Sequence, residues 1–229
     1  MKRYTILLPL LCLVIGLLLG SLLPVPWAER ESLVPSASST PALKQAEMGD
    51  SSGQSAPLLD AADNFPLLNA ACSVVRALER QDYAALAGFV HPERGVAFTP
   101  YSTVNTETDQ TFTATQIRDL ARDSTAYIWG FVDGRGSLIE LTMEDYFTRY
   151  VWDADYTQAP QIGIDRLMMS GNALENLPEA YPGCRFVDFC FPGRDPSSQG
   201  LDWCSLRLVF APGETSWHLV GIVHGEWTI

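Results

Sequence analysis

A histidine and a glutamate near the C-terminus are the residues of this chain best suited to catalysis. His224 and Glu226 are two positions apart in a segment of strand-like composition. Their side chains are therefore expected on one face of a strand, about 7 Å apart. A histidine in such a pair can serve as a general base, with Arg207 nearby as an electrostatic support. Two simpler interpretations remain open: both side chains are solvated on an outer face, or they tie down the last strand.

The position of this pair depends on a predicted hairpin of two strands, Trp203–Phe210 and Trp217–Trp227. If Ala211 and Ser216 flank a four-residue loop, Phe210 pairs with Trp217, and one face of the hairpin is apolar throughout. The opposite face then carries the candidate ligand-binding residues Trp203, Arg207, His218, His224 and Glu226. Because side chains alternate along a strand, a slip of one residue would change which of them meet.

Two cysteines on neighbouring predicted strands could form a disulfide. If the intervening loop is symmetric, Cys190 faces Cys204 directly, at a separation that a disulfide tolerates. The alternative is that both are reduced and buried as small apolar side chains. The same register places Asp188 on the apolar face and Arg207 opposite Val187, which counts against it. A shift of one residue would pair Asp188 with Arg207 instead.

Other chemical signals in the sequence are weak. His91 and Glu93 could be an acid–base pair or half of a metal site, but a histidine at the end of a helix can also interact with its terminal carbonyl groups. The segment Asp133-Gly134-Arg135-Gly136 lacks the alternating oxygens of a calcium loop and predicts a turn. No HExxH, CxxC, GxSxG or phosphate-binding glycine motif is present. We therefore expect no metal and no cofactor.

The N-terminus predicts a membrane segment and a tether. Lys2 and Arg3 precede an apolar core at residues 6–23, which is nearly long enough to span a bilayer with its N-terminus inside. Residues 1–28 are thus a signal anchor, or alternatively a signal peptide whose cleavage would release a secreted protein. Residues 29–64 are rich in Ser and Pro and predict a disordered linker. Residues 65–229 have the length of one domain.

The order of elements in that domain predicts an α+β fold, with N-terminal helices packed on a curved antiparallel sheet. Helices are expected from Asn64, with Pro66 in the first turn, from Asp82 to His91-Pro92, and after capping boxes at Thr113–Gln116 and Thr142–Asp145. Strands are expected at Gly95–Tyr101, Ala126–Val132, Cys184–Phe191, Trp203–Phe210 and Trp217–Trp227. A formal net charge of −12 argues against nucleic acid as a partner. The tryptophans and tyrosines could form a carbohydrate platform, but core packing explains most of them.

Several strings resemble an uncharacterised extracytoplasmic domain of Gram-positive bacteria. They are His91-Pro92-Glu93-Arg94-Gly95-Val96, Trp129-Gly130 with Asp133-Gly134, the run LDWCSLRLVF at 201–210, and the ending Leu219–Ile229. The order of helices and strands is similar to the NTF2-like (cystatin-like) fold. The resemblance implies a location outside the cytoplasm and a fold, but no particular reaction.

We therefore expect a single-pass membrane protein whose extracytoplasmic domain binds a small ligand, an envelope polymer or an envelope protein. The alternative is a small hydrolase or isomerase that uses the His224/Glu226 pair. An enzyme or a receptor predicts an enclosed pocket with His224 largely buried. A docking module predicts an exposed apolar patch around Val220 and Ile222.

Overall fold

The computed structural model describes residues 58–228. The predicted signal anchor at 1–28, with its apolar core at 6–23, and most of the predicted linker lie outside the described residues. Within the described part, no helix has both the length and the apolar character that a bilayer crossing requires.

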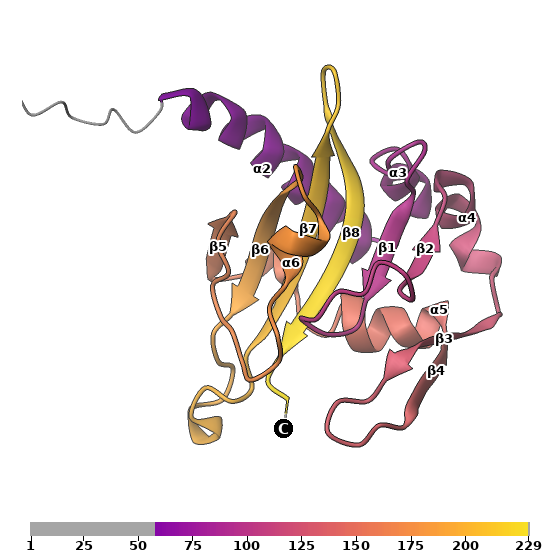
Figure 1. Cartoon of the computed structure of the whole chain (residues 1–229), viewed down its shortest axis with the longest axis vertical. Helices are drawn as coiled ribbons and strands as arrows, with labels where there is room; N and C mark the ends of the chain where they lie inside the picture. The colour runs from indigo at the N-terminus through magenta and orange to yellow at the C-terminus, as the bar shows by residue number, and fades with distance from the viewer. Residues whose placement is uncertain (1–57, 229) are drawn as a thin grey trace, which may run out of the picture. The chain divides into compact units, whose positions relative to one another are not determined.

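The domain has a mixed α+β fold built on a six-stranded sheet in the order β2-β1-β8-β7-β6-β5 (Figure 1). Neighbouring strands are antiparallel except for β1 and β8, which run parallel. The strands are β1 Val96–Thr99, β2 Gln110–Phe112, β5 Gln161–Ile164, β6 Arg185–Phe191, β7 Cys204–Pro212 and β8 Trp217–Glu226. A separate hairpin pairs β3 (Ala126–Phe131) with β4 (Leu138–Thr142). The predicted strands are thus confirmed, whereas β2, β4 and β5 were not predicted.

Five α-helices precede or connect these strands in the described chain. They are α2 Leu58–Glu79, α3 Tyr83–Ala87, α4 Ala114–Asp119, α5 Met143–Tyr146 and α6 Leu177–Ala180. The shorter helical turns are η1 Leu120–Arg122, η2 Phe147–Val151, η3 Tyr156–Gln158 and η4 Pro196–Ser198. η2 has π-helical hydrogen bonding and continues α5.

The predicted caps start the helices where expected. Asp82 accepts a hydrogen bond from the Ala85 N–H at 2.9 Å, and Thr113 forms a full capping box with Gln116. Thr142 likewise accepts a hydrogen bond from the Asp145 N–H at the start of α5. Three short helices therefore begin at local signals in the sequence.

Two predicted helix boundaries are wrong. The first helix starts at Leu58 rather than Asn64, so Pro66 lies inside it and residues 58–64, expected in the linker, are helical. The leucines and alanines at 58–62 are strong helix formers and extend the helix upstream. The next helix, α3, ends at Ala87 and not at His91-Pro92, because Gly88 caps it with its N–H.

The sheet is buried on both faces. On one face, which we call the helix face, α2 packs against Leu206, Leu208 and other apolar side chains of the larger core cluster. On the other, the loop face, α6 covers Val209 and Val220 in a smaller cluster. Figure 1 shows α2 behind the strands and α6 in front of them. The exposed apolar patch that a docking module predicts around Val220 and Ile222 is not found there, because the exposed fractions of these two side chains are 3% and 1%.

The register of the β7–β8 hairpin also differs from the prediction. Phe210 pairs with Leu219 rather than with Trp217, because β7 continues to Pro212 before the chain turns. Between Val209 and Phe210 the register then shifts by one residue in a β-bulge. A bulge moves every side chain beyond it to the other face of the strand, so His224 pairs with Leu206 on the helix face.

The register between β6 and β7 excludes the predicted disulfide. Phe191 pairs with Cys204 and Asp188 with Arg207, which is the one-residue shift considered as the alternative. Cys190 therefore lies on the loop face and Cys204 on the helix face, and the four cysteines of the described chain are free thiols.

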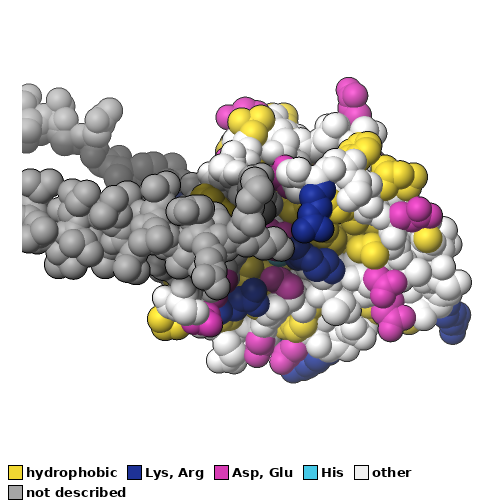
Figure 2. Space-filling model, turned by 90° about the horizontal axis from the view of Figure 1, so that it is seen from below, with side chains coloured by type: hydrophobic (Ala, Val, Ile, Leu, Met, Phe, Trp, Pro, Cys, Tyr) yellow, Lys and Arg dark blue, Asp and Glu magenta, His cyan; other side chains and the backbone are white. Residues whose placement is uncertain are grey.

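Charged and apolar side chains are interleaved on the end of the domain that points down in Figure 1. Figure 2 views this end and shows acidic, basic and apolar side chains next to one another. The formal net charge of the chain is −12, but this face is not uniformly acidic.

Candidate functional site

The structure separates the five residues that the sequence placed on one surface. His224 and Glu226 lie on the helix face, whereas Arg207 lies on the loop face. His218 lies at the opposite end of β8, where its ring contacts that of His91 at a centroid distance of 5.7 Å. Trp203 is buried immediately before β7. The predicted shared surface is therefore wrong, and the bulge in the hairpin is the reason.

His91 belongs to a turn and not to a helix end. Its Nδ1 accepts hydrogen bonds from the N–H groups of Glu93 and Arg94 at 3.2 and 3.1 Å. Burial and the nearby Arg94 and His218 lower the pKa of this histidine. No group of three or more potential metal ligands occurs within 58–228. The expected contact with helix carbonyls is thus wrong.

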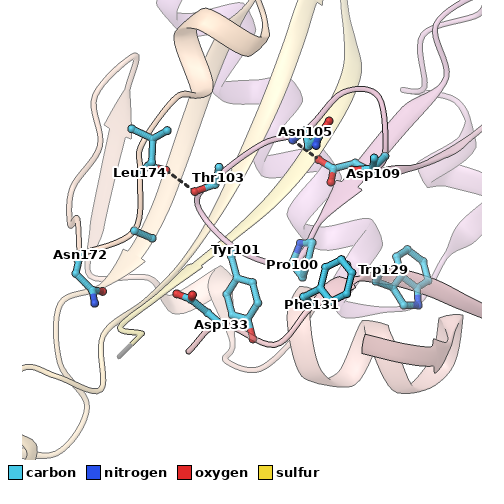
Figure 3. A pocket seen from close by; sticks show the side chains of 13 residues that line it. Pro100, Tyr101, Thr103, Asn105, Asp109, Trp129, Phe131, Asp133, Asn172 and Leu174 are labelled. Carbon is cyan, nitrogen blue, oxygen red and sulfur yellow. Dashed lines mark hydrogen bonds between the residues drawn. The ribbon is translucent and has the colours of Figure 1, made fainter. Parts of the chain in front are cut away.

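A pocket of about 510 Å³ opens beside the sheet, between three segments that are distant in sequence. The loop from β1 to β2, residues 100–109, forms one wall, the end of β3 with its turn forms a second, and residues 172–174 form the third. Figure 3 shows Tyr101, Phe131, Asp109 and Leu174 around the opening. We call this cavity the loop pocket.

The loop at 100–109 is anchored from the helix face of the sheet. The fully buried His224 directs Nδ1 to the carbonyl oxygen of Pro100 at 3.2 Å. A carbonyl can only accept, so Nδ1 carries the proton. The hydroxyl of Tyr101, the next residue, lies 3.4 Å from that of Tyr150, whose ring contacts His224.

The same loop is also anchored from the loop face. Arg207 donates from Nη1 to the hydroxyl of the buried Ser102 at 3.1 Å. Val104 exchanges two hydrogen bonds with the side chain of Asn176, at 2.8 and 2.9 Å. Thr103 donates to the carbonyl of Leu174 across the pocket, as Figure 3 shows. Five consecutive loop residues, 100–104, are therefore held by side chains or backbone from elsewhere in the fold.

An acidic group completes the buried network on the helix face. Asp153 Oδ2 lies 3.6 Å from His224 Nε2, and Tyr156 donates to Asp153 Oδ1 at 2.6 Å. Burial alone would raise the pKa of Asp153, but the hydrogen bonds and the charge of His224 outweigh it and lower the pKa to about 2. Oxygen atoms of Pro100 and Asp153 thus lie opposite the two ring nitrogens of His224.

The loop-face network consists of one guanidinium and two carboxylates. Arg207, with no exposed side-chain surface, bonds Glu175 through both Nη atoms, at 2.6 and 3.1 Å. The carboxylate of Asp188, which is also fully buried, lies 3.9 Å from Arg207 Nε and accepts from the Met168 N–H at 2.8 Å. Burial raises the pKa of Asp188, although Arg207 acts in the opposite direction.

Asp109 is the partly buried acid of the loop pocket. Its Oδ2 accepts from the Thr99 hydroxyl at 2.6 Å and from the Asn105 N–H at 3.0 Å. Burial raises the pKa of Asp109, and these two hydrogen bonds only partly offset the effect. Both bonds end on Oδ2, so within the described chain Oδ1 remains available to a ligand.

Searches with this chain against protein families, curated proteins and solved structures gave no match. The site is therefore interpreted from its own geometry.

The sequence did not point to the loop pocket. Trp129 was weighed as core or as part of a carbohydrate platform, and the segment 133–136 was interpreted as a turn rather than a calcium loop. The residues at 100–109 carried no motif. One signal was present: ten mostly polar residues separate the strand ending at Thr99 from β2, which is long for a hairpin connection. Long ordered loops of this kind are often functional.

Proposed function

We propose that this domain is a ligand-binding module of the cell envelope, tethered to the membrane by residues 6–23, and that the loop pocket is its binding site. The observation that carries the proposal is the anchoring of one pocket wall from both faces of the sheet. His224 holds Pro100 from one face, and Arg207 holds Ser102 from the other.

Anchoring the loop through buried polar side chains costs free energy of desolvation. An arrangement with this cost suggests a function rather than a stabilising role. Burying an ion pair usually costs more in desolvation than the pair returns, so a buried pair is weak evidence for a stabilising role. Here the buried ion pair of Arg207 and the fully buried ring of His224 contact the same short loop. A loop held in one conformation loses little entropy when a ligand binds. The pocket wall is thus organised in advance.

The NTF2-like fold is part of this proposal. It is supported by the two helices α2 and α3 that open the domain, by the cover of α2 on one sheet face, and by the meander β6–β7–β8 that closes the chain. The strings that resemble a Gram-positive extracytoplasmic domain support the location in the envelope.

An enzyme that uses His224 and Glu226 has less support. The side chain of His224 has no exposed surface, and its two nitrogens face Pro100 and Asp153. Glu226 forms an ion pair with Arg149 at 2.6 Å. A general base must reach the proton that it removes, directly or through one water. The histidine instead positions the wall of the pocket.

A pocket-filling variant tests the binding role. Thr108 lines the loop pocket and is exposed, so Thr108→Trp should fill the cavity without disturbing the core. The full-length chain would be screened by saturation-transfer NMR against sugars, amines and small amides at millimolar concentration. We expect bound compounds whose signal is lost in Thr108→Trp and kept in Thr125→Trp, a matched change at an exposed site outside this lining. Compounds that bind both variants equally, or no bound compound at all, would contradict the proposal.

The envelope location has its own test. A reporter enzyme that is active only outside the cytoplasm, fused after Ile229, should be active, and it should remain with the membrane fraction. An inactive reporter that fractionates with the cytosol would contradict the location and would leave the proposed role of the pocket unaffected.

A further inference from the structure

We infer that the ligand of the loop pocket carries an organic ammonium group. The inference rests on the proposed binding role and adds the chemical class of the ligand. It depends on the charge of the lining, on the hydrogen bonds that the lining residues have already made, and on the side chains at the mouth.

The charged side chains that line the pocket are all acidic. Asp109 and Asp133 contribute carboxylates, and no Lys, Arg or His occurs among the lining residues of the described chain. At pH 7 such a pocket repels phosphates, carboxylates and sulfates and attracts a cation. Anionic polymers and anionic small molecules are therefore poor ligands.

The lining has both donors and acceptors, but its charged groups are acceptors only. The side-chain oxygens of Asn105 and Asn172 already accept hydrogen bonds, so their amide groups present neutral donors. The hydroxyl of Thr103 already donates to Leu174, and the Asn105 N–H already donates to Asp109. Oδ1 of Asp109 is available to a ligand, because the Thr99 hydroxyl bonds to Oδ2. Oδ2 of Asp133 is also available, because the Gly134 N–H bonds to Oδ1. An ammonium group supplies three N–H donors and a positive charge, so it complements these acceptors better than a neutral hydroxyl does.

Asp109 has a particular reason to bind a cation. Its carboxylate is partly buried and has two neutral hydrogen-bond donors, Thr99 and Asn105, but no positively charged neighbour in the described chain. Partial burial without a counter-ion disfavours the ionised form. A ligand cation at Oδ1 would compensate that charge in a medium where the attraction is only partly screened.

The mouth of the pocket suits the carbon skeleton around an ammonium group. Phe131 and Leu174 line the pocket with exposed fractions of 63% and 67%, and Tyr101 is drawn between them in the view of Figure 3. Aromatic faces attract organic cations as well as apolar groups. Trp129 supports this wall from inside, where it is buried against Tyr146 at a centroid distance of 3.8 Å.

The test compares amines with their acetylated forms, which have nearly the same shape but no charge. The probes are a glucosamine disaccharide and Nα-acetyl-lysine amide, each beside its N-acetylated counterpart, titrated by calorimetry into the full-length chain. We expect at least one amine to bind about tenfold more tightly than its counterpart, with a loss of affinity as salt rises. The two probes distinguish an amino sugar from a peptide amine as the source of the group.

Variants then locate the contact. Asp109→Asn should weaken amine binding about tenfold, whereas Asp119→Asn, the same change at an exposed position of α4, should have no effect. Because Asp109 also holds the loop, Asp133→Asn provides a second, exposed variant, and it should weaken binding by a smaller factor. Equal binding of amine and acetylated probe, or full affinity in both pocket variants, would overturn the inference.

Chemical coupling gives an independent readout. The last lysine of the chain is Lys44, so carbodiimide activation in the domain yields few internal cross-links and leaves its carboxylates to the added amine. We expect the lysine-amide probe to couple to Asp109 and Asp133 faster than to the exposed Glu214. Uniform coupling would overturn the inference. If neutral compounds still bind in a manner that Thr108→Trp abolishes, the binding role stands and only the ammonium assignment fails.

Discussion

On the helix face of the sheet, His224 lies between the carbonyl of Pro100 and the carboxylate of Asp153, whereas on the loop face Arg207 lies among Glu175, Asp188 and Ser102. In the first network, a histidine nitrogen and a carboxylate oxygen lie 3.6 Å apart. The second has one cation for two acids and bonds as short as 2.6 Å. Both end on the same loop.

The two networks differ in how their carboxylates would be left if the central side chain, Arg207 or His224, were removed. Without Arg207, the buried Asp188 has no cation nearby and Glu175 loses its bidentate partner. Without His224, Asp153 still accepts a hydrogen bond from Tyr156 and keeps some exposed surface. We therefore expect the loop-face network to matter most for stability and the helix-face network mainly to position Pro100.

The largest expected effect is that of Arg207→Met. Removing one partner of a buried ion pair leaves an uncompensated charge, so we expect a loss of about 3–5 kcal/mol in the free energy of unfolding. Urea unfolding followed by tryptophan fluorescence measures it. The control is Arg149→Met: Arg149 pairs with Glu226 at 2.6 Å but is 46% exposed, and it should lose about 1 kcal/mol or less. Equal losses in the two variants would remove the difference between the networks.

Acid should affect the two networks in opposite directions. The pKa of Asp153 is lowered from 3.8 to about 2. Its contribution to the free energy of unfolding is therefore fully present above pH 4 and is lost as the pH falls from about 4 to 2. The advantage of wild type over Asp153→Asn should thus shrink by about 2 kcal/mol across that window. The pKa of Asp188 is raised. Its contribution to the free energy of unfolding is therefore present below about pH 4 and is lost as the pH rises through the raised pKa.

The measurement is the free energy of unfolding between pH 2 and pH 7 for wild type, Asp153→Asn and Asp188→Asn. The wild-type advantage over Asp188→Asn should decrease as the pH rises, opposite to the trend for Asp153→Asn. Parallel trends would contradict the assignment of these two carboxyl groups.

A smaller effect is expected where the backbone of β8 covers Arg207. A Cβ at Gly225 would lie 2.6 Å from Ser205 Oγ and 3.0 Å from Arg207 Nη2, so Gly225→Ala should cost about 1–3 kcal/mol. The matched change is Gly171→Ala, whose nearest contact is Trp203 at 3.4 Å, an ordinary distance. Thermal unfolding should separate the two variants, and an unchanged midpoint in Gly225→Ala would show that Arg207 is not held against this strand.

The smallest effect concerns the cysteines. Cys190 and Cys204 lie on opposite faces, so oxidising conditions should not join them, and dithiothreitol should leave the unfolding midpoint unchanged. Burial raises the pKa of both thiols to about 12, which also makes them unreactive at neutral pH. Mass spectrometry of alkylated peptides under denaturing conditions would detect a disulfide, and its presence would contradict the β6–β7 register.

The elements that could be predicted are those with local signals. Asp82, Thr113 and Thr142 start helices because a side chain caps the N–H groups of the next turn, and this requires only neighbouring residues. The last three strands were evident from their composition. The strands β2, β4 and β5 were not predicted.

The candidate site was harder to predict, for a specific reason. The sequence singled out His224, Glu226 and Arg207 as candidate site residues on one surface, but a bulge near Val209 exchanged the faces of the sheet for half of β8. Alternation has a period of two, so one extra residue is enough to reverse every later assignment. The loop pocket was not predicted at all, because its walls come from segments near 100, 130 and 173.

The sequence by itself determined the types of the elements, the helix caps, the acidic character and the apolar N-terminal run, since each depends on residues that are close in the chain. Only the tertiary structure decided that two buried side chains on opposite sheet faces, His224 and Arg207, hold one loop, and that this loop lines a pocket with acidic walls. Contacts between residues such as Pro100 and His224 depend on strand register and on parallel pairing of β1 with β8, which no short stretch of sequence encodes.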